Sequence, residues 1–88
     1  MLFLTEYIIQ RRIPGANPLN YFAKSFEEFR NGFGANGELW LGLEKIHQLT
    51  LAGRWIMEVH LTDWNGHKKF ARYNSFKLGP GPRYILTV

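Results

Sequence analysis

Hydrophobic and polar positions follow two different periods along the chain, and each period predicts its own kind of element. Residues 5–13 are rich in β-branched and aromatic side chains, which favour a strand. The Pro-Gly and Asn-Pro pairs within 14–18 then break the chain and predict an irregular loop. From residue 54 apolar and polar side chains alternate with a period of two, which predicts a half-buried antiparallel strand over 54–62.

A first short helix is predicted after Ser25. Ser25 and Glu28 have the spacing of a capping box, in which each side chain bonds the backbone N–H of the other residue. Gly32 stands where a glycine is expected to end the helix. Three phenylalanines recur at helical spacing, and we expect this stripe to face the core: Phe22, Phe26 and Phe29.

A second helix is predicted over 43–51 and is closed by Gly53. Its apolar side chains recur at spacings of three and four, which gives the segment one apolar side. These side chains belong to Leu43, Ile46 and Leu49, with Thr50 beside them.

The Asn-Gly pair at 65–66 is the strongest hairpin signal and favours a two-residue type I′ turn. That turn places Leu61 across from Phe70, which is a suitable apolar pair. It also places Val59 across from Arg72, which is a poor one. Two interpretations of this hairpin remain open: the strand register shifts, or the sheet is covered on both faces.

We favour the shift, as a bulge near Ala71 that brings Tyr73 onto the inner face. The Gly-Pro repeat at 79–82 predicts a turn. Residues 84–88 then form the last strand of a three-stranded meander.

The segment 32–53 organises the chain, because four of its glycines surround two large aromatic side chains. Glycines at this density indicate tight turns or close backbone approach. We therefore predict a structural hub of aromatic residues: Phe33, Trp40, Trp55 and Trp64. Four further residues complete the expected core: Leu43, Ile46, Leu61 and Phe76.

Composition limits the chemistry. The 88 residues suit one domain, and they include no cysteine, which excludes disulfides, a thiolate nucleophile and a cysteine-bound zinc. The hydroxyl of Ser25 is used by its cap, the three histidines do not converge, and Asp63 is the only aspartate. We expect no enzyme, and we assign no catalytic, metal or cofactor-binding residue.

The net charge of +4 raises the question of an anionic partner. The candidate anion-binding residues are Arg11, Arg12, Lys68, Lys69 and Arg72. A solvated face is the plainer interpretation of these charges. Nucleic acid is not the expected ligand, because a small domain needs its aromatic side chains in the core. We also expect no membrane span and no signal peptide.

Two stretches, 31–55 and 57–79, closely resemble the fibrinogen-related domain. This is the C-terminal globular module of fibrinogen chains, ficolins, tenascins, angiopoietins and tachylectin-type lectins. The resemblance rests on Gly-Phe-Gly, Gly-Glu-Leu-Trp-Leu-Gly-Leu, Ile-His-Gln-Leu-Thr and Asp-Trp-Asn-Gly, in this order, and extends from about Gln10 to Val88. Residues 1–9 depart from the family, whose members carry a cysteine and a Gly-Gly-Trp-Thr-Val-like run there.

The resemblance implies a single truncated domain over 1–88, with the N-terminal and central lobes of the module. The family's calcium loop and most of its ligand pocket belong to a later lobe, so no ligand or calcium residue is carried over. Family members are secreted, which implies an extracellular protein.

We therefore predict an α+β fold, with two short helices on a mainly antiparallel sheet that is centred on a 54–78 hairpin. The expected function is a non-catalytic recognition or assembly module that acts by protein–protein contact, including self-association as a homodimer, with a glycan as a further ligand. One alternative is a basic surface for anionic polymers, such as sulfated glycan or nucleic acid. The other is an engineered or minimal scaffold without a ligand site.

Overall fold

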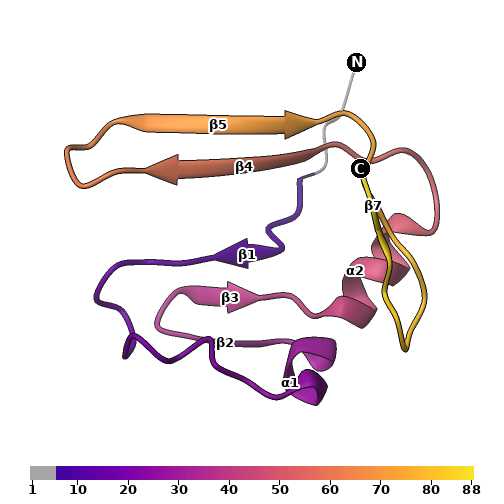
Figure 1. Cartoon of the computed structure of the whole chain (residues 1–88), viewed down its shortest axis with the longest axis horizontal. Coiled ribbons are helices and arrows are strands. Elements are labelled where there is room, and N and C mark those ends of the chain that lie inside the picture. Colours follow the sequence, from indigo (N-terminus) through magenta and orange to yellow (C-terminus); the bar gives the residue numbers. More distant parts are fainter. Residues whose placement is uncertain (1–5) are drawn as a thin grey trace. The chain divides into compact units, whose positions relative to one another are not determined.

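The computed structural model describes residues 6–88. Short antiparallel strands and two helices make up this part of the chain, which confirms the α+β class with mainly antiparallel pairing. The chain forms two compact units, one that ends at Ile46 and one that spans His47–Val88 (Figure 1). Each unit is described by itself.

The first unit contains a three-stranded antiparallel sheet in the order β1-β3-β2. Its strands are β1 (Gln10–Arg11), β2 (Phe33–Ala35) and β3 (Glu38–Trp40), and Figure 1 shows β3 between the other two. The strand expected over 5–13 is thus limited to two residues, and its first position lies outside the described residues. Gln10 and Arg11 pair with Trp40 and Leu39, and the Leu41 N–H donates to the Ile9 carbonyl at 2.8 Å just before this pair of residues.

Helix α1 (Phe26–Asn31) begins and ends as predicted. The Ser25 Oγ accepts the Glu28 N–H at 3.2 Å, and Glu28 Oε1 accepts the Ser25 N–H at 3.4 Å. The Gly32 N–H donates to the Glu28 carbonyl at 2.8 Å. The phenylalanine stripe differs from expectation, because the Phe26 side chain is 57% exposed. The helix starts at Phe26, so Phe22 lies before it and the three rings do not share a helical face.

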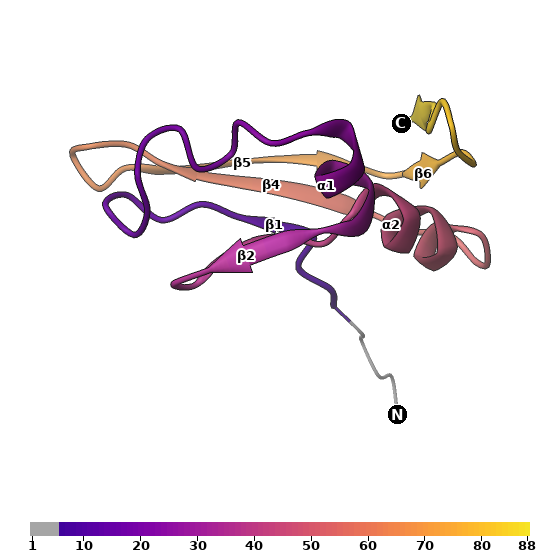
Figure 2. The same cartoon turned by 90° about the horizontal axis from the view of Figure 1, so that it is seen from below.

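The turn between β2 and β3 is a two-residue Asn-Gly turn. Asn36 and Gly37 have φ values of 53° and 86°, and Ala35 pairs with Glu38 across them. Positive φ at both central residues is the requirement of a type I′ turn. The type I′ chemistry that the sequence suggested for 65–66 is therefore found here (Figure 2 shows β2 and the tip that follows it).

Two glycines let backbone segments pack directly on each other. A Cβ atom at Gly32 would lie 2.3 Å from the Leu41 carbonyl oxygen, and one at Gly42 would lie 2.8 Å from the Asn31 carbonyl carbon. Both glycines also have positive φ, 95° and 114°. The expected close approach around this glycine-rich segment is confirmed.

Helix α2 (Leu43–Thr50) is the predicted amphipathic helix, and Ile46 on it is only 2% exposed. In the second unit the end of α2 holds strand β6 (Lys77–Leu78). The Leu78 N–H donates to Thr50 Oγ1 at 3.1 Å, and His47 Nδ1 donates to the Leu78 carbonyl at 2.8 Å. Because a carbonyl only accepts, the Nδ1 atom of His47 carries the proton.

The second unit also contains a hairpin of β4 (Met57–Thr62) and β5 (Lys68–Tyr73), which pair antiparallel. The observed register is one residue away from the two-residue-turn prediction, with His60 opposite Phe70 and Val59 opposite Ala71. The bulge proposed near Ala71 is therefore wrong, but Tyr73 does share a face with Met57 and Val59, as expected from a shift in register.

The loop of this hairpin explains the register. Asp63 pairs with His67, because the Asp63 N–H donates to the His67 carbonyl at 2.9 Å and the Gly66 N–H donates to the Asp63 carbonyl at 3.1 Å. Gly66 has a φ of 83°. A three-residue loop with a left-handed glycine at its third position shifts the pairing by one residue relative to a type I′ turn.

The last strand is shorter than expected and has a different partner. Strand β7 (Leu86–Thr87) pairs with β6 in a separate two-stranded sheet. The three-stranded meander and the 54–78 hairpin at the sheet centre are therefore wrong. Tyr84 lies in the turn, with a φ of 46° and its N–H bonded to the Pro80 carbonyl, whereas the Ile85 carbonyl still accepts the Gly79 N–H at 2.8 Å.

Candidate functional site

The β4–β5 hairpin presents two exposed faces. The first face combines apolar side chains of both strands with one lysine: Met57, Val59, Leu61, Lys69, Ala71 and Tyr73. The second is more polar: Glu58, His60, Thr62, Lys68, Phe70 and Arg72. Met57 is half-buried, and every residue from 58 to 73 is exposed. Leu61 and Phe70, on opposite faces, are 66% and 65% exposed.

On the second face His60 contacts both an aromatic ring and a carboxylate. The His60 and Phe70 rings stack with their centroids 5.6 Å apart and their planes 17° from parallel. His60 Nε2 lies 3.7 Å from Glu58 Oε2, and Glu58 stands opposite Arg72. Lys68 and Arg72 flank Phe70 on the same face, because side chains two residues apart on a strand point the same way.

The loop at the end of the hairpin is ordered by Asp63. Its carboxylate accepts the N–H groups of Asn65 and His67 at 2.9 and 2.8 Å, and its other oxygen lies 3.1 Å from His67 Nδ1. The backbone bond from His67 is the largest cause of a lowered pKa for Asp63, and burial opposes it. Trp64, on this loop, is 95% exposed.

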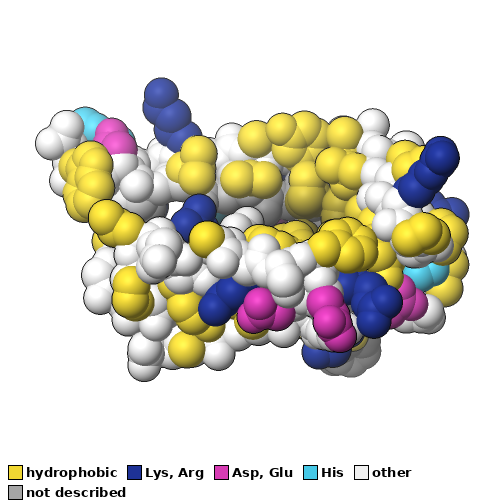
Figure 3. All heavy atoms as spheres, turned by 60° about the horizontal axis from the view of Figure 1, so that its bottom comes forward, with side chains coloured by type: hydrophobic (Ala, Val, Ile, Leu, Met, Phe, Trp, Pro, Cys, Tyr) yellow, Lys and Arg dark blue, Asp and Glu magenta, His cyan; other side chains and the backbone are white. Residues whose placement is uncertain are grey.

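The five candidate anion-binding residues are divided between the two units, and those of β5 lie on two faces. Lys68 and Arg72 share one face of β5, and Lys69 lies on the other face. Arg11 and Arg12 belong to the first unit. The Arg12 guanidinium is 4.3 Å from the centre of the Phe22 ring, so it makes a cation–π contact. Figure 3 likewise shows basic side chains scattered among hydrophobic ones on the face that it displays.

The four expected hub aromatics lie in three different environments. Phe33 and Trp40 belong to an aromatic cluster in the first unit, where both contact the Phe29 ring at 5.3 and 5.8 Å between centroids. Trp55 is half-buried in the second unit, and its Nε1 donates to the Ala52 carbonyl. Trp64 is exposed on the hairpin loop and is not a core residue in this structure. Leu61 was also expected in the core and is likewise exposed.

A buried carboxylate in the first unit was not anticipated from the sequence. Glu38 is 8% exposed and accepts the Ile13 N–H at 2.9 Å and the Asn17 amide at 2.8 Å. The bond from Asn17 is the largest cause of a lowered Glu38 pKa, followed by Ile13; burial opposes both, and the Arg12 charge adds to the lowering. These bonds tie the 13–17 loop to β3, so Glu38 is a structural group.

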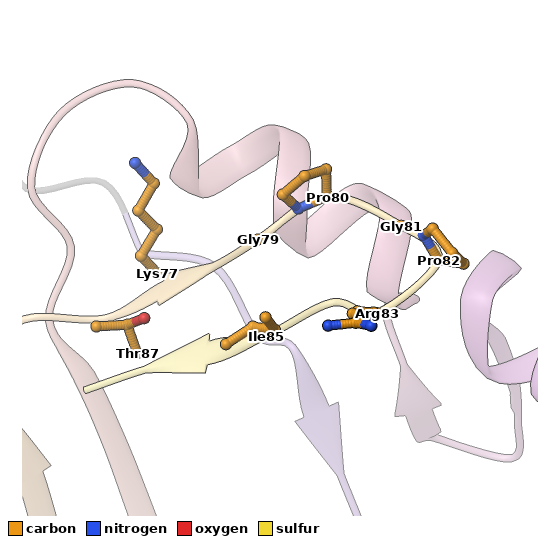
Figure 4. Close-up of a pocket in the computed structure, with 8 residues that line it drawn as sticks. All are labelled: Lys77, Gly79, Pro80, Gly81, Pro82, Arg83, Ile85 and Thr87. Atoms are coloured by element: carbon orange, nitrogen blue, oxygen red, sulfur yellow. The ribbon is translucent and has the colours of Figure 1, made fainter.

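A shallow, open pocket of about 540 Å³ lies at the turn between β6 and β7 (Figure 4). Its walls come from the two strands and the intervening turn: Lys77, Gly79, Pro80, Gly81, Pro82, Arg83, Ile85 and Thr87. The lining is mostly apolar with two cationic side chains, Lys77 and Arg83, and it includes no carboxylate and no histidine. Over residues 6–88, no three His, Asp or Glu side chains gather as a metal site. No helix in this part of the chain is long and apolar enough to cross a membrane.

Comparison with known families defines the class of protein. The profile for the C-terminal globular domain of fibrinogen beta and gamma chains matches residues 6–88. The chain therefore belongs to this family, as the glycine- and tryptophan-rich motifs of residues 31–79 predicted.

Individual relatives support the assignment. The chain is 45% identical to human angiopoietin-related protein 2 over 78 residues. This match covers 88% of this chain and 15% of the relative. It is 44% identical over 83 residues to human ficolin-3, with 92% and 27% covered. The chain thus spans less than a third of these curated relatives.

Solved structures show the same fold. The fibrinogen-like globe domain of human ANGPTL2 matches with a TM-score of 0.79 at 44% identity, over 89% of this chain and 36% of that one. A lamprey fibrin D-dimer, solved in complex with the peptide ligand Gly-His-Arg-Pro-amide, matches with a TM-score of 0.75 at 37% identity. That match covers 83% of this chain and 23% of the lamprey chain.

Proposed function

We propose that this chain is a non-catalytic recognition or assembly module that acts by protein–protein contact at the β4–β5 hairpin. The observation that carries the proposal is the exposure of apolar side chains on both faces of the hairpin. Val59, Leu61 and Tyr73 share one face and are 38%, 66% and 40% exposed, and Phe70 on the other face is 65% exposed. Exposed apolar groups that share a face are typical of surfaces that bind another protein.

The composition of the hairpin supports this role. Tryptophan, tyrosine and arginine are the residue types that most often dominate binding energy at interfaces, and the hairpin carries one of each in Trp64, Tyr73 and Arg72. The family supports it as well, because one relative of known structure holds a peptide ligand. An extracellular location is part of the proposal and follows from the family resemblance.

The test is the solution mass of the chain by light scattering, at rising micromolar concentration and in low and high salt. We expect a mass that rises above the 10.3 kDa of one chain and that persists in high salt, because apolar contacts are weakly screened. Leu61→Ser should lower the mass toward that of one chain.

Leu19→Ser is the matched control, because Leu19 is 102% exposed and belongs to the first unit, outside the hairpin segment 57–73. It should leave the association unchanged. A chain that remains at the mass of one copy under all conditions would contradict an assembly role and would favour a self-sufficient scaffold.

A second candidate function rests on the alternation of Lys68, Phe70 and Arg72 along one face of β5. Two cations that flank an aromatic ring suit an anionic polymer such as a sulfated glycan. Binding to heparin should then fall steeply as salt rises and should weaken in a Lys68→Ala, Arg72→Ala double variant. Lys69→Ala is the control, because Lys69 lies on the opposite face.

A further inference from the structure

The backbone groups of Leu78, in strand β6, point away from its partner strand β7. Leu78 lies opposite Leu86, and the next N–H along, that of Gly79, donates to the Ile85 carbonyl at 2.8 Å. Hydrogen-bonded and non-hydrogen-bonded pairs alternate along an antiparallel ladder, so Leu78 and Leu86 form a non-hydrogen-bonded pair. The N–H and the carbonyl of Leu78 are therefore directed to the outer edge of β6.

Side chains of helix α2 occupy this outer edge in the place of a strand. The Leu78 N–H donates to Thr50 Oγ1 at 3.1 Å, and His47 Nδ1 donates to the Leu78 carbonyl at 2.8 Å. His47 and Thr50 are both buried. Residues three apart lie on the same face of a helix, so α2 presents one donor and one acceptor side by side. A residue of a partner strand presents the same two groups in a β-ladder.

The chain that follows α2 continues along the same edge. Backbone groups of alternate residues in a strand point to the same side, so Phe76, just before β6, shares the outer edge with Leu78. The Phe76 N–H donates to the Trp55 carbonyl at 3.0 Å. Hydrogen bonds from residues 47–55 thus follow the backbone of residues 76–78, as those of a neighbouring strand would.

We propose that residues 47–55 act as a surrogate third strand, which closes the outer edge of β6 and makes the end of α2 and the β6–β7 hairpin one cooperative unit. An open edge invites pairing with another chain, and proteins often cover such an edge with a helix. Here two side chains of the Ile-His-Gln-Leu-Thr motif form the cover and satisfy both backbone groups of Leu78. This role is independent of the contact proposed for the β4–β5 hairpin.

The surrogate strand sets a chemical requirement at each of two positions. Residue 47 must place an N–H where the imidazole has Nδ1. Asparagine can supply that donor, whereas the amide of glutamine lies one bond further along its side chain. Residue 50 must present a hydroxyl oxygen, which serine retains and valine lacks. His47→Asn and Thr50→Ser therefore keep the hydrogen bonds, and His47→Gln and Thr50→Val each remove one.

The experiment measures amide hydrogen exchange by NMR in these four variants. Thr50→Val and His47→Gln should each speed the exchange of the Leu78 amide by about tenfold, because a lost buried hydrogen bond weakens the whole unit. The Phe76 amide should speed up by a similar factor. It is the informative readout, because its own bond to the Trp55 carbonyl involves neither altered side chain. Thr50→Ser and His47→Asn should leave both amides within about threefold of the unmodified chain.

The Asp63 amide, which bonds the His67 carbonyl in the β4–β5 loop, is the internal control and should not change. Faster exchange at Leu78 alone would show separate local bonds and would overturn the cooperative unit. Equal exchange in the asparagine and glutamine variants of His47 would overturn the surrogate strand as well. Should Thr50→Val fail to fold, the two His47 variants decide by the same amides. None of these readouts depends on association, so a failure here leaves the proposed hairpin contact standing.

Discussion

Trp40 and Trp64 are two residues of one type in opposite environments. The Trp40 indole packs against Phe29 and donates to its carbonyl at 2.7 Å, whereas the Trp64 side chain is 95% exposed. Trp40→Ala should lower the free energy of unfolding by about 3 kcal/mol, because it removes one ring from the aromatic cluster and leaves a cavity there. Trp64→Ala should change it by less than about 0.5 kcal/mol. Urea unfolding measures both, and equal losses would contradict the assignment.

The lowered pKa of Glu38 leads to a second prediction at the scale of a single residue. Because the folded pKa lies below the ordinary 4.5, the unfolded chain binds a proton more readily in this range, and stability rises with pH. The contribution of Glu38 is complete above about pH 5 and is lost as the pH falls through the folded pKa. Glu38→Gln should flatten this acid dependence.

Asn17→Ala offers a matched variant for that measurement, because it keeps the carboxylate and removes the largest cause of the shift. NMR titration of Glu38 should give a higher pKa in Asn17→Ala than in the unmodified chain. An unchanged pKa would show that Asn17 does not hold the carboxylate in solution.

At the scale of elements, two glycines with similar φ are predicted to respond differently to alanine. Gly32 and Gly66 have φ values of 95° and 83°. A methyl group at Gly66 meets nothing within 4 Å, whereas at Gly32 it meets the backbone of residues 40–41. Gly66→Ala should cost about 1 kcal/mol of unfolding free energy from the backbone alone. Gly32→Ala should cost at least about 1 kcal/mol more, since backbone atoms must move.

Elements that depend on local chemistry could be predicted from the sequence. The capping box of Ser25 and the glycine at residue 32 each act within a few residues, so helix α1 was placed correctly. The register of the β4–β5 hairpin could not be predicted in this way. Asn-Gly suits both a two-residue and a three-residue loop, and the choice depends on the Asp63 carboxylate, which accepts two N–H groups of the loop. A signal for the longer loop was thus present as an aspartate two residues before the Asn-Gly pair.

The candidate site could be predicted only as a set of residues. Lys68, Lys69 and Arg72 were named from composition, but the register decides which β4 side chains lie opposite each of them. The bond between Asn17 and Glu38 joins residues that are 21 apart in the sequence, and no local pattern reports such a contact. Trp64 was placed in the core because tryptophan is usually well buried, and the loop that it occupies overrides that tendency.

At the scale of the whole molecule, the exposed hairpin predicts a hydrogen-exchange pattern. As concentration rises, the amides of the β4–β5 hairpin should become more protected if the hairpin is the assembly contact proposed above. The amides of β2 and β3, in the first unit, should not change and serve as the internal control. Mass spectrometry of exchanged fragments measures both regions, and uniform protection along the chain would point to non-specific aggregation.

Two of the three Asn-Gly pairs of this chain, at 36–37 and 65–66, lie in hairpin loops but differ in how the asparagine side chain is held, which bears on deamidation during storage. Deamidation requires the asparagine side-chain carbonyl to be attacked by the next backbone nitrogen. The Asn36 amide donates to Asn17 Oδ1 at 2.8 Å and to the Ala16 carbonyl at 3.4 Å, which restrains its rotation. Asn65 lies in an exposed loop. Storage should therefore convert Asn65 before Asn36 and place a new negative charge beside the lysines of β5.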